Sequence, residues 1–189
     1  MTLSRITVFL FLSTRCGTMK RFVQVYTGNG KGKTTASFGL ALRAAGAGLN
    51  TFIAQFTKGM YCSELSALTR FTDHITIRQY GRDHFISQSP SSTDHHLARD
   101  AFLDVQRLTL SAKYDVVILD EINIAVFFNL VPVEDLLNLI ATRPEHVELV
   151  CTGRYADPQL IECADLVTEM REVKHYYTTG VEARAGIEL

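Results

Sequence analysis

A glycine-rich stretch near the start of the chain contains the residue types that bind phosphate groups. Residues 27–35 read TGNGKGKTT, with closely spaced glycines before a lysine and two threonines. Such glycines let successive backbone N–H groups point at one anion, the lysine adds a positive charge, and a threonine hydroxyl can hold Mg²⁺. The stretch therefore predicts a site for a nucleotide triphosphate. The residues expected there are Gly28, Asn29, Gly30, Lys31, Gly32, Lys33, Thr34 and Thr35.

The elements on either side of this loop favour a phosphate site over an ordinary turn. An apolar strand is expected over Phe22–Tyr26 and a helix rich in Ala and Leu over Lys33–Ala47. The loop then ends at a helix N-terminus, whose free N–H groups and positive dipole end attract anions. The usual G-x-x-x-x-G-K-[ST] pattern would place its first glycine where this chain has Thr27. We therefore expect a shortened or altered phosphate loop.

A pair of acids follows an uninterrupted apolar run. Tyr114–Asp120 reads as a buried parallel strand, and Glu121 comes directly after it. Mg²⁺ at a phosphate site takes few protein oxygens, and an acid at the end of a neighbouring strand can supply one. We predict that Thr34 and Glu121 hold Mg²⁺ with support from Asp120. In the alternative, Asp120 only ends the strand and Glu121 only starts the next helix.

Further candidate residues lie in or after other predicted elements. Arg154 follows the apolar strand Val147–Cys151 and could reach phosphates or carboxylates, although a plain turn with a solvated arginine is the alternative. Arg43, on the first helix, could contact the nucleotide or form a surface salt bridge. Phe56 and Lys58 lie at the end of the second strand, so we expect them at the same edge of the sheet as the phosphate loop.

The alternation of strands and helices predicts an α/β fold. The expected architecture is a three-layer, P-loop NTPase-like (RecA-like) domain with a mostly parallel sheet and helices on both faces. The predicted strands are Phe22–Tyr26, Thr51–Phe56, Ile75–Tyr80, Tyr114–Asp120, Val147–Cys151 and Leu166–Met170. The predicted helices are Lys33–Ala47, Ser63–Phe71, Asp94–Lys113, Ile122–Phe128, Val133–Thr142 and Asp157–Ala164, and Gly81–Thr93 reads as a loop.

The composition limits the classes of protein that need to be considered. The chain has 189 residues, 47% hydrophobic and 21% charged, as is typical of a soluble globular domain. Its formal charge of −1 excludes a strongly basic nucleic-acid-binding protein. The four cysteines show no CxxC spacing, which argues against a zinc ribbon or a disulfide framework and favours a reducing cytoplasm. We predict one domain over residues 19–189.

Residues 1–18 are expected to be a non-native or disordered extension. Arg5 followed by the apolar run Ile6–Leu12 imitates a signal peptide. The run is too short to span a bilayer, and no small-x-small cleavage site follows it. An export signal is the alternative. We predict a cytoplasmic protein without a membrane segment.

Five segments taken together resemble one enzyme family. They are TGNGKGKTTASFG, QFTKG, VVILDEIN, RPEHVELVCTGR and ADLVTEMREVKHYYTTGVEARAGIE, in this order from about Lys20 to the C-terminus. The set resembles the ATP:corrinoid adenosyltransferases of the cobalamin salvage type. The unusual phosphate loop and the VKH…GVxAxxGIE tail are its most specific parts. In that tail, Lys174–Tyr177 could form either a charged tail or a lid over the nucleotide.

The resemblance implies a reaction in which the Co(I) ion of a corrinoid attacks the ribose 5′ carbon of ATP and triphosphate leaves. It implies that Lys33 neutralises charge on the triphosphate and that Thr34 and Glu121 hold Mg²⁺, with Asp120 in support. It also implies a homodimer, ATP and a reduced corrinoid as substrates, and a flavodoxin, ferredoxin-type or flavin electron donor.

One departure from the family is a missing tryptophan. Better-known members carry a Gly-Phe-x-Trp segment that helps strip the lower axial ligand from cobalt, whereas this chain has no Trp and reads GRDHF over residues 81–85. Phe56, Lys58 and Phe85 are our candidates for corrinoid contacts. Two alternatives stay open: an ordinary P-loop ATPase or kinase, which would release ADP, and a corrinoid-binding carrier that has lost turnover.

Overall fold

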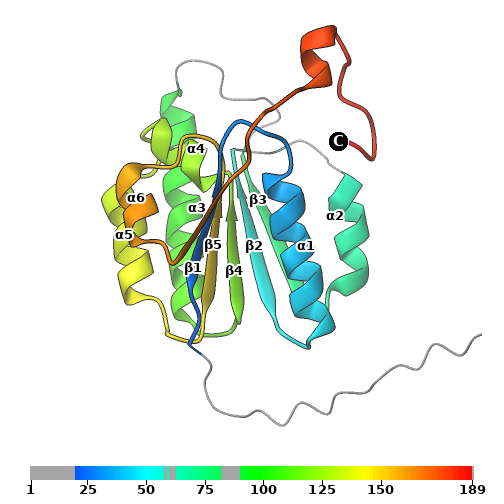
Figure 1. The fold of residues 1–189 in the computed structure, drawn as a ribbon. Helices are drawn as coiled ribbons and strands as arrows, with labels where there is room; N and C mark the ends of the chain where they lie inside the picture. Colours follow the sequence, from blue (N-terminus) through cyan, green and yellow to red (C-terminus); the bar gives the residue numbers. More distant parts are fainter. Residues whose placement is uncertain (1–19, 58, 60–62, 82–89, 189) are drawn as a thin grey trace, which may run out of the picture.

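A parallel sheet of six strands forms the centre of the protein (Figure 1). The structure is a computed structural model, which describes residues 20–57, 59, 63–81 and 90–188. The strand order is β3-β2-β4-β5-β1-β6, and neighbouring strands pair in parallel throughout. The strands are β1 (Val23–Thr27), β2 (Thr51–Phe56), β3 (Ile75–Tyr80), β4 (Val116–Asp120), β5 (Glu148–Thr152) and β6 (Leu166–Glu169).

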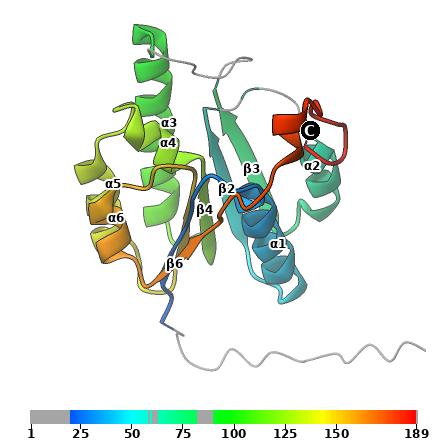
Figure 2. The ribbon, with the colours of Figure 1, turned by 45° about the horizontal axis from the view of Figure 1, so that its top comes forward.

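Helices cover both faces of this sheet (Figures 1 and 2). Helices α1 and α2 lie on one face, and α3, α4, α5 and α6 lie on the other. This arrangement confirms the expected three-layer α/β fold of the P-loop-like type. The helices are α1 (Lys33–Gly46), α2 (Ser63–Leu68), α3 (Ser92–Leu110), α4 (Ile122–Phe127), α5 (Val133–Thr142) and α6 (Pro158–Cys163), with short 3₁₀ turns η1 (Thr69–Phe71) and η2 (Tyr176–Thr179).

Alternating strand side chains fill two separate cores. On one face, Ile53 and Ile118 pack with Phe38 of α1. On the other, Phe52 packs in a larger cluster with Phe102 of α3. Because both faces of the sheet are covered, the central strands are apolar at nearly every position. This explains why uninterrupted apolar runs located them correctly in the sequence.

Helix α3 begins two residues earlier than the sequence pattern predicted, at Ser92 and not at Asp94. The reason is a capping box at Ser91. The Ser91 hydroxyl accepts from the Asp94 N–H at 3.3 Å, and the Asp94 carboxylate accepts from the Ser91 N–H at 2.8 Å. The sequence pattern predicts a loop over Gly81–Thr93, whereas Ser91 is the N-cap residue at which the helix begins.

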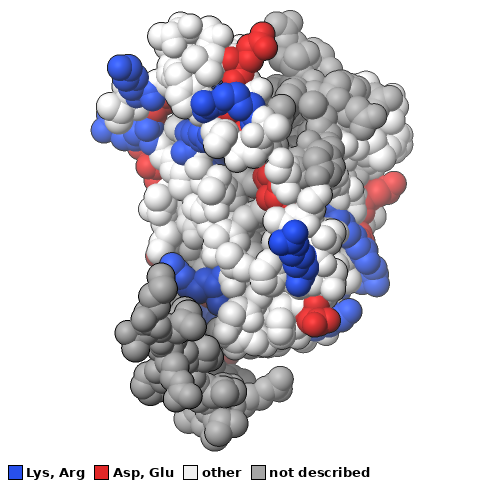
Figure 3. Space-filling model, turned by 90° about the vertical axis from the view of Figure 1, so that its right-hand side faces the viewer, with Lys and Arg blue, Asp and Glu red and all other residues white. Residues whose placement is uncertain are grey.

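The surface agrees with the near-zero formal charge. On the face shown in Figure 3, basic and acidic side chains are interspersed. Among the described residues, no helix is long and apolar enough to cross a membrane. The expected extension over residues 1–18 lies outside the described residues.

Candidate active site

The predicted phosphate loop connects the end of β1 to the first residue of α1. Its backbone is left-handed at Gly28 (φ +92°) and Gly32 (φ +120°), where other residues would be strained. A Cβ atom at Gly28 would lie 2.5 Å from the carbonyl oxygen of Met170, and the Gly30 N–H donates to that same oxygen at 2.7 Å. The glycines therefore curve the loop and also let the segment after β6 pack directly against it.

We expect the substitution Gly30→Ala to disturb this packing and to weaken nucleotide binding. The added Cβ would lie 2.7 Å from the Met170 carbonyl oxygen and 2.9 Å from that of Arg171, so one of the two segments must shift. Overpacking of this kind costs about 1–3 kcal/mol, which urea unfolding measures. The affinity for MgATP, measured by calorimetry, should fall as well.

Gly39→Ala is the matched control for Gly30→Ala. A Cβ at Gly39 meets no atom within 4 Å, and alanine is favoured over glycine inside a helix such as α1. The control should keep its ATP affinity and its stability. If Gly30→Ala binds ATP as tightly as Gly39→Ala does, the close approach at Met170 is unimportant for the loop.

Lys33 and Thr34 begin α1 at the point where the loop ends. Lys33 is only 8% exposed, and its Nζ donates to the carbonyl oxygens of Gly28 and Gly30 at 2.6 and 2.8 Å. The ammonium group is thus held inside the curve of the loop, beside the N-terminal N–H groups of the helix. This combination of donors and positive charge can bind an anion.

Asp120 lies at the end of β4 and is fully buried. Its carboxylate accepts hydrogen bonds from Thr34 Oγ1 at 2.9 Å, from Thr152 Oγ1 at 2.7 Å and from Gln55 Nε2 at 3.1 Å. Gln79 Nε2 donates in turn to Gln55 Oε1 at 3.1 Å. The strand register explains this row of hydrogen-bonded side chains, since Gln55 of β2 pairs with Asp120 on one side and with Gln79 on the other.

Glu121 directly follows Asp120 and is the N-cap of α4. Its backbone is left-handed (φ 62°), an uncommon conformation for a residue with a side chain. Its N–H donates to Thr152 Oγ1 at 3.0 Å, which ties the turn to β5. The side chain lines the cavity in front of the phosphate loop, whereas Asp120 lies beneath it. The two neighbouring acids therefore occupy different environments.

A cavity of about 670 Å³ opens over the loop. It brings together residues from the loop, α1, α2, the turn after β5 and the C-terminal segment, which is residues 170–188 after β6. Lys33, Thr34, Glu121 and Arg154 all contribute to its lining. The full lining is Asn29, Gly30, Lys31, Gly32, Lys33, Thr34, Thr35, Phe38, Ser63, Glu64, Ala67, Glu121, Arg154, His175, Gly186, Ile187 and Glu188.

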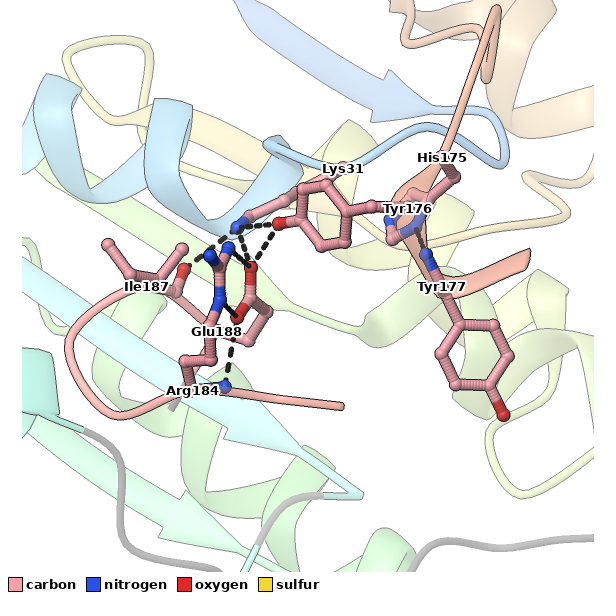
Figure 4. Close-up of polar contacts among 7 residues, drawn as sticks. All are labelled: Lys31, His175, Tyr176, Tyr177, Arg184, Ile187 and Glu188. Carbon is pink, nitrogen blue, oxygen red and sulfur yellow. Dashed lines mark hydrogen bonds and ion pairs between the residues drawn. The ribbon is translucent and has the colours of Figure 1, made fainter. Parts of the chain in front are cut away.

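The C-terminal segment closes one side of this cavity by contacts with Lys31 (Figure 4). Lys31 Nζ donates to Tyr176 Oη at 3.1 Å, to the Ile187 carbonyl at 2.9 Å and to Glu188 Oε1 at 2.7 Å. Hydrogen bonds hold the pKa of Glu188 well below its usual value. The largest effect comes from Arg184, followed by those from Lys31 and Tyr176. The hydrogen bond to Glu188 raises the pKa of Lys31.

Comparison with known proteins assigns the chain to a family. The sequence model of the family described as ATP:corrinoid adenosyltransferase BtuR/CobO/CobP matches residues 19–189. This protein belongs to that family. It is 34% identical to the corrinoid adenosyltransferase of Escherichia coli K12 over 165 residues, which is 87% of this chain and 83% of the relative. The Pseudomonas aeruginosa PAO1 enzyme is 34% identical over 87% of this chain and 81% of its own length.

Membership in the adenosyltransferase family matches the expectation from the sequence motifs, but the structure does not bring every predicted site residue to the cavity. Arg43 lies in the last turn of α1, exposed, and is not part of the cavity lining. At 1.5 Å per residue, ten residues separate it from Lys33 by about 15 Å along the helix. Lys58 and Phe85 lie outside the described residues.

The position of Phe56 does not fit the predicted contact with the corrinoid. Its side chain is fully buried in the core on the α3 side and packs on Tyr80, with ring centroids 6.1 Å apart. Side chains alternate along a strand, so Gln55 faces the site while Phe56 points to the other face. The sequence placed Phe56 at the correct edge of the sheet but did not settle which face it occupies.

Phe56→Ala should therefore reduce stability strongly. Truncating a fully buried phenylalanine costs about 3–5 kcal/mol, which urea unfolding would show. Leu103→Ala is the comparison, because Leu103 is 53% exposed and its truncation should cost far less. A stable Phe56→Ala protein that fails to bind corrinoid would restore the original expectation.

Some residues of the site were not singled out from the sequence. Thr152 donates a hydrogen bond to Asp120, and Gln79 donates one to Gln55. Gly186, Ile187 and Glu188 line the cavity. The only available signal for the last three was the GIE motif of the tail, which the resemblance marked as specific without assigning it a contact.

Proposed function

We propose that this protein transfers the 5′-deoxyadenosyl group of ATP to the Co(I) ion of a reduced corrinoid and releases triphosphate. The electron pair of Co(I) forms the bond to the 5′ carbon, and the pair of the breaking C5′–O5′ bond leaves on the triphosphate oxygen. Family membership supports the reaction. The observation that carries the proposal is the convergence of Lys33, Thr34, Glu121 and Arg154 on the cavity over the phosphate loop.

The cavity suits a triphosphate that must leave as one unit. The triphosphate gains a negative charge as the C5′–O5′ bond breaks, so donors fixed around it stabilise the transition state more than the bound substrate. Lys33, Lys31 and Arg154 place positive charge at the cavity, and the loop adds backbone N–H groups. The protein requires no general base, because the cobalt supplies the attacking electron pair.

The side chains at the site fit Mg²⁺. The Thr34 hydroxyl lies 2.9 Å from Asp120 Oδ1, and Glu121 lines the same cavity, so the set consists of the hard oxygen ligands that Mg²⁺ prefers. No cluster of three or more His, Cys, Asp or Glu that could hold a metal ion is present among the described residues. We propose that Thr34 and Glu121 hold Mg²⁺ and that Asp120 orients Thr34. Bound Mg²⁺ would offset charge on the triphosphate.

The proposal extends to partners and location. Co(I) must be generated by reduction, so we propose a flavodoxin, a ferredoxin-type protein or a flavin as electron donor. We also propose a homodimer that works in the cytoplasm, as the family resemblance implies.

An anaerobic assay tests the proposed reaction. The purified protein is mixed with MgATP and cobalamin reduced chemically to Co(I), while absorbance and phosphate products are followed. A light-sensitive Co–C product with one equivalent of triphosphate supports the proposal. ADP and phosphate without a Co–C bond would indicate an ATPase or kinase, and tight corrinoid binding without either product would indicate a carrier.

A further inference from the structure

The C-terminal segment is fixed to the phosphate loop at two separate places. Just after β6, the Met170 N–H donates to the Thr27 carbonyl at 2.8 Å, and the Met170 carbonyl accepts from Gly30 at 2.7 Å. Near the end of the chain, Ile187 and Glu188 receive hydrogen bonds from Lys31. The residues between these two points therefore run past the cavity with both ends attached to the loop (Figures 2 and 4).

His175 is held in a defined orientation within this segment. It lines the cavity, and its Nδ1 accepts a hydrogen bond from the Tyr177 N–H at 3.0 Å. Its ring also contacts those of Tyr176 and Tyr177, with centroids 4.9 and 6.4 Å away. Two neighbouring rings and one backbone bond therefore hold the imidazole in place (Figure 4).

The bond to Tyr177 decides which nitrogen carries the proton. A nitrogen that accepts a hydrogen bond has no hydrogen of its own, so the neutral ring must carry its hydrogen on Nε2. Within the described part of the chain, no group accepts from Nε2. The ring that carries this N–H donor lines the same cavity as Lys31, Lys33 and Arg154.

The two lysines that line the cavity beside His175 already have anionic or carbonyl partners. Lys31 bonds to Glu188 at 2.7 Å, and Lys33 bonds to two loop carbonyls. The imidazole N–H of His175 differs from them, since it can add a hydrogen bond to a phosphate oxygen without first breaking an ion pair. Such a donor contributes most where negative charge increases during the reaction.

We propose that His175 is a catalytic residue whose Nε2–H donates a hydrogen bond to the triphosphate as it leaves. This inference rests on the proposed function. No proton is transferred: the C5′–O5′ electron pair stays on the triphosphate oxygen, and the hydrogen bond shortens as charge collects there. The C-terminal segment therefore completes the leaving-group site and does not only cover it.

Three substitutions at His175 separate the Nε2–H donor from the hydrogen bond that Nδ1 accepts from the Tyr177 N–H. His175→Ala removes both. His175→Asn keeps a short side-chain oxygen that can accept from the Tyr177 N–H, as an N-cap residue does, but cannot reach the position of Nε2. His175→Gln places an N–H donor near that position. His146→Ala is the matched control, because His146 lies just before β5, at the amino ends of the strands and away from the cavity.

With chemically reduced Co(I) cobalamin, we expect kcat to fall about 10- to 100-fold in His175→Ala and His175→Asn. The KM for cobalamin should stay the same, His175→Gln should recover most of the rate, and His146→Ala should match the unsubstituted protein. Thermal unfolding checks that all variants are folded. If His175→Asn keeps the full rate, the donor is not needed. If kcat falls equally in all three His175 variants, the loss of the N–H donor does not explain the fall. Either result overturns the proposal.

Binding of inorganic triphosphate separates this inference from the proposed function. Calorimetry with Mg²⁺ and inorganic triphosphate requires no corrinoid and no turnover. His175→Ala and His175→Asn should bind triphosphate at least about 5-fold more weakly, and His175→Gln and His146→Ala should bind it normally. If no adenosylated product forms but this pattern holds, the proposed function fails and the contact stands. If the reaction proceeds but triphosphate affinity is equal in all variants, the contact is wrong.

Discussion

Replacing Lys33 with alanine should lower the rate of adenosylation by at least about 100-fold. The Lys33 ammonium group lies within the curve of the phosphate loop, bonded to the Gly28 and Gly30 carbonyls, and is only 8% exposed. A charge held in such a position needs little rearrangement when negative charge grows on the triphosphate. The rate is measured anaerobically with saturating MgATP and Co(I) cobalamin.

Lys113→Ala is the control for this experiment. Lys113 is exposed near the start of β4, at the opposite edge of the sheet from the loop, and its ammonium group contacts the Tyr114 ring at 5.4 Å. Its removal should leave the rate unchanged. If Lys33→Ala keeps near-normal turnover in a folded protein, the loop does not bind the triphosphate through this residue.

The central strands were predicted well because their burial imposes a simple pattern. A parallel sheet covered on both faces needs apolar side chains in both directions, and the runs around Ile53, Ile118 and Val150 satisfy that need. Helix ends were less exact. Composition alone predicts a loop at Ser91, because the capping role of Ser91 depends on two reciprocal hydrogen bonds with Asp94.

The predicted site depended on local order along the chain, and its unforeseen parts depend on long-range pairing. Lys33, Thr34, Glu121 and Arg154 each follow a strand directly or through one short loop, so a parallel sheet must bring them to one edge. The bond from Gln79 to Gln55 requires the register of β2 against β3.

The C-terminal contacts were harder still to anticipate. Lys31 and Glu188 are 157 residues apart in sequence, and no periodicity connects them. The sequence leaves Lys174–Tyr177 as either a charged tail or a lid over the nucleotide, and in the structure Tyr176 bonds to Lys31 while His175 lines the cavity.

The neighbouring acids Asp120 and Glu121 should fail in different ways when each loses its charge. Asp120→Asn replaces a carboxylate oxygen with an NH₂ group, although both oxygens accept from donors, namely Thr34 and Thr152 at one and Gln55 at the other. In this fully buried position the new NH₂ group either meets the Gln55 NH₂ group or requires the Thr34 and Thr152 hydroxyls to turn from donors into acceptors. We expect a loss of about 1–3 kcal/mol in the free energy of unfolding and at least about a 100-fold loss of rate.

Glu121→Gln should instead preserve stability and change the response to metal. Its side chain lines the cavity and is only partly buried, so the neutral amide remains solvated. The Mg²⁺ concentration needed for half-maximal rate should rise about 10-fold or more, because an amide oxygen is a weaker ligand than a carboxylate. Titrating the rate with Mg²⁺, alongside urea unfolding of both variants, separates the two effects.

Asp115→Asn is the control for both substitutions, because it changes the same chemical group just before β4, at the other edge of the sheet. Its carboxylate accepts from the Asn50 N–H at 2.9 Å in an exposed position, so the change should affect neither the rate nor the Mg²⁺ response. An unchanged Mg²⁺ response in Glu121→Gln, with a raised requirement in Asp120→Asn, would make Asp120 the direct ligand. The hydrogen bonds from Gln79 through Gln55 would then orient the metal ligand itself.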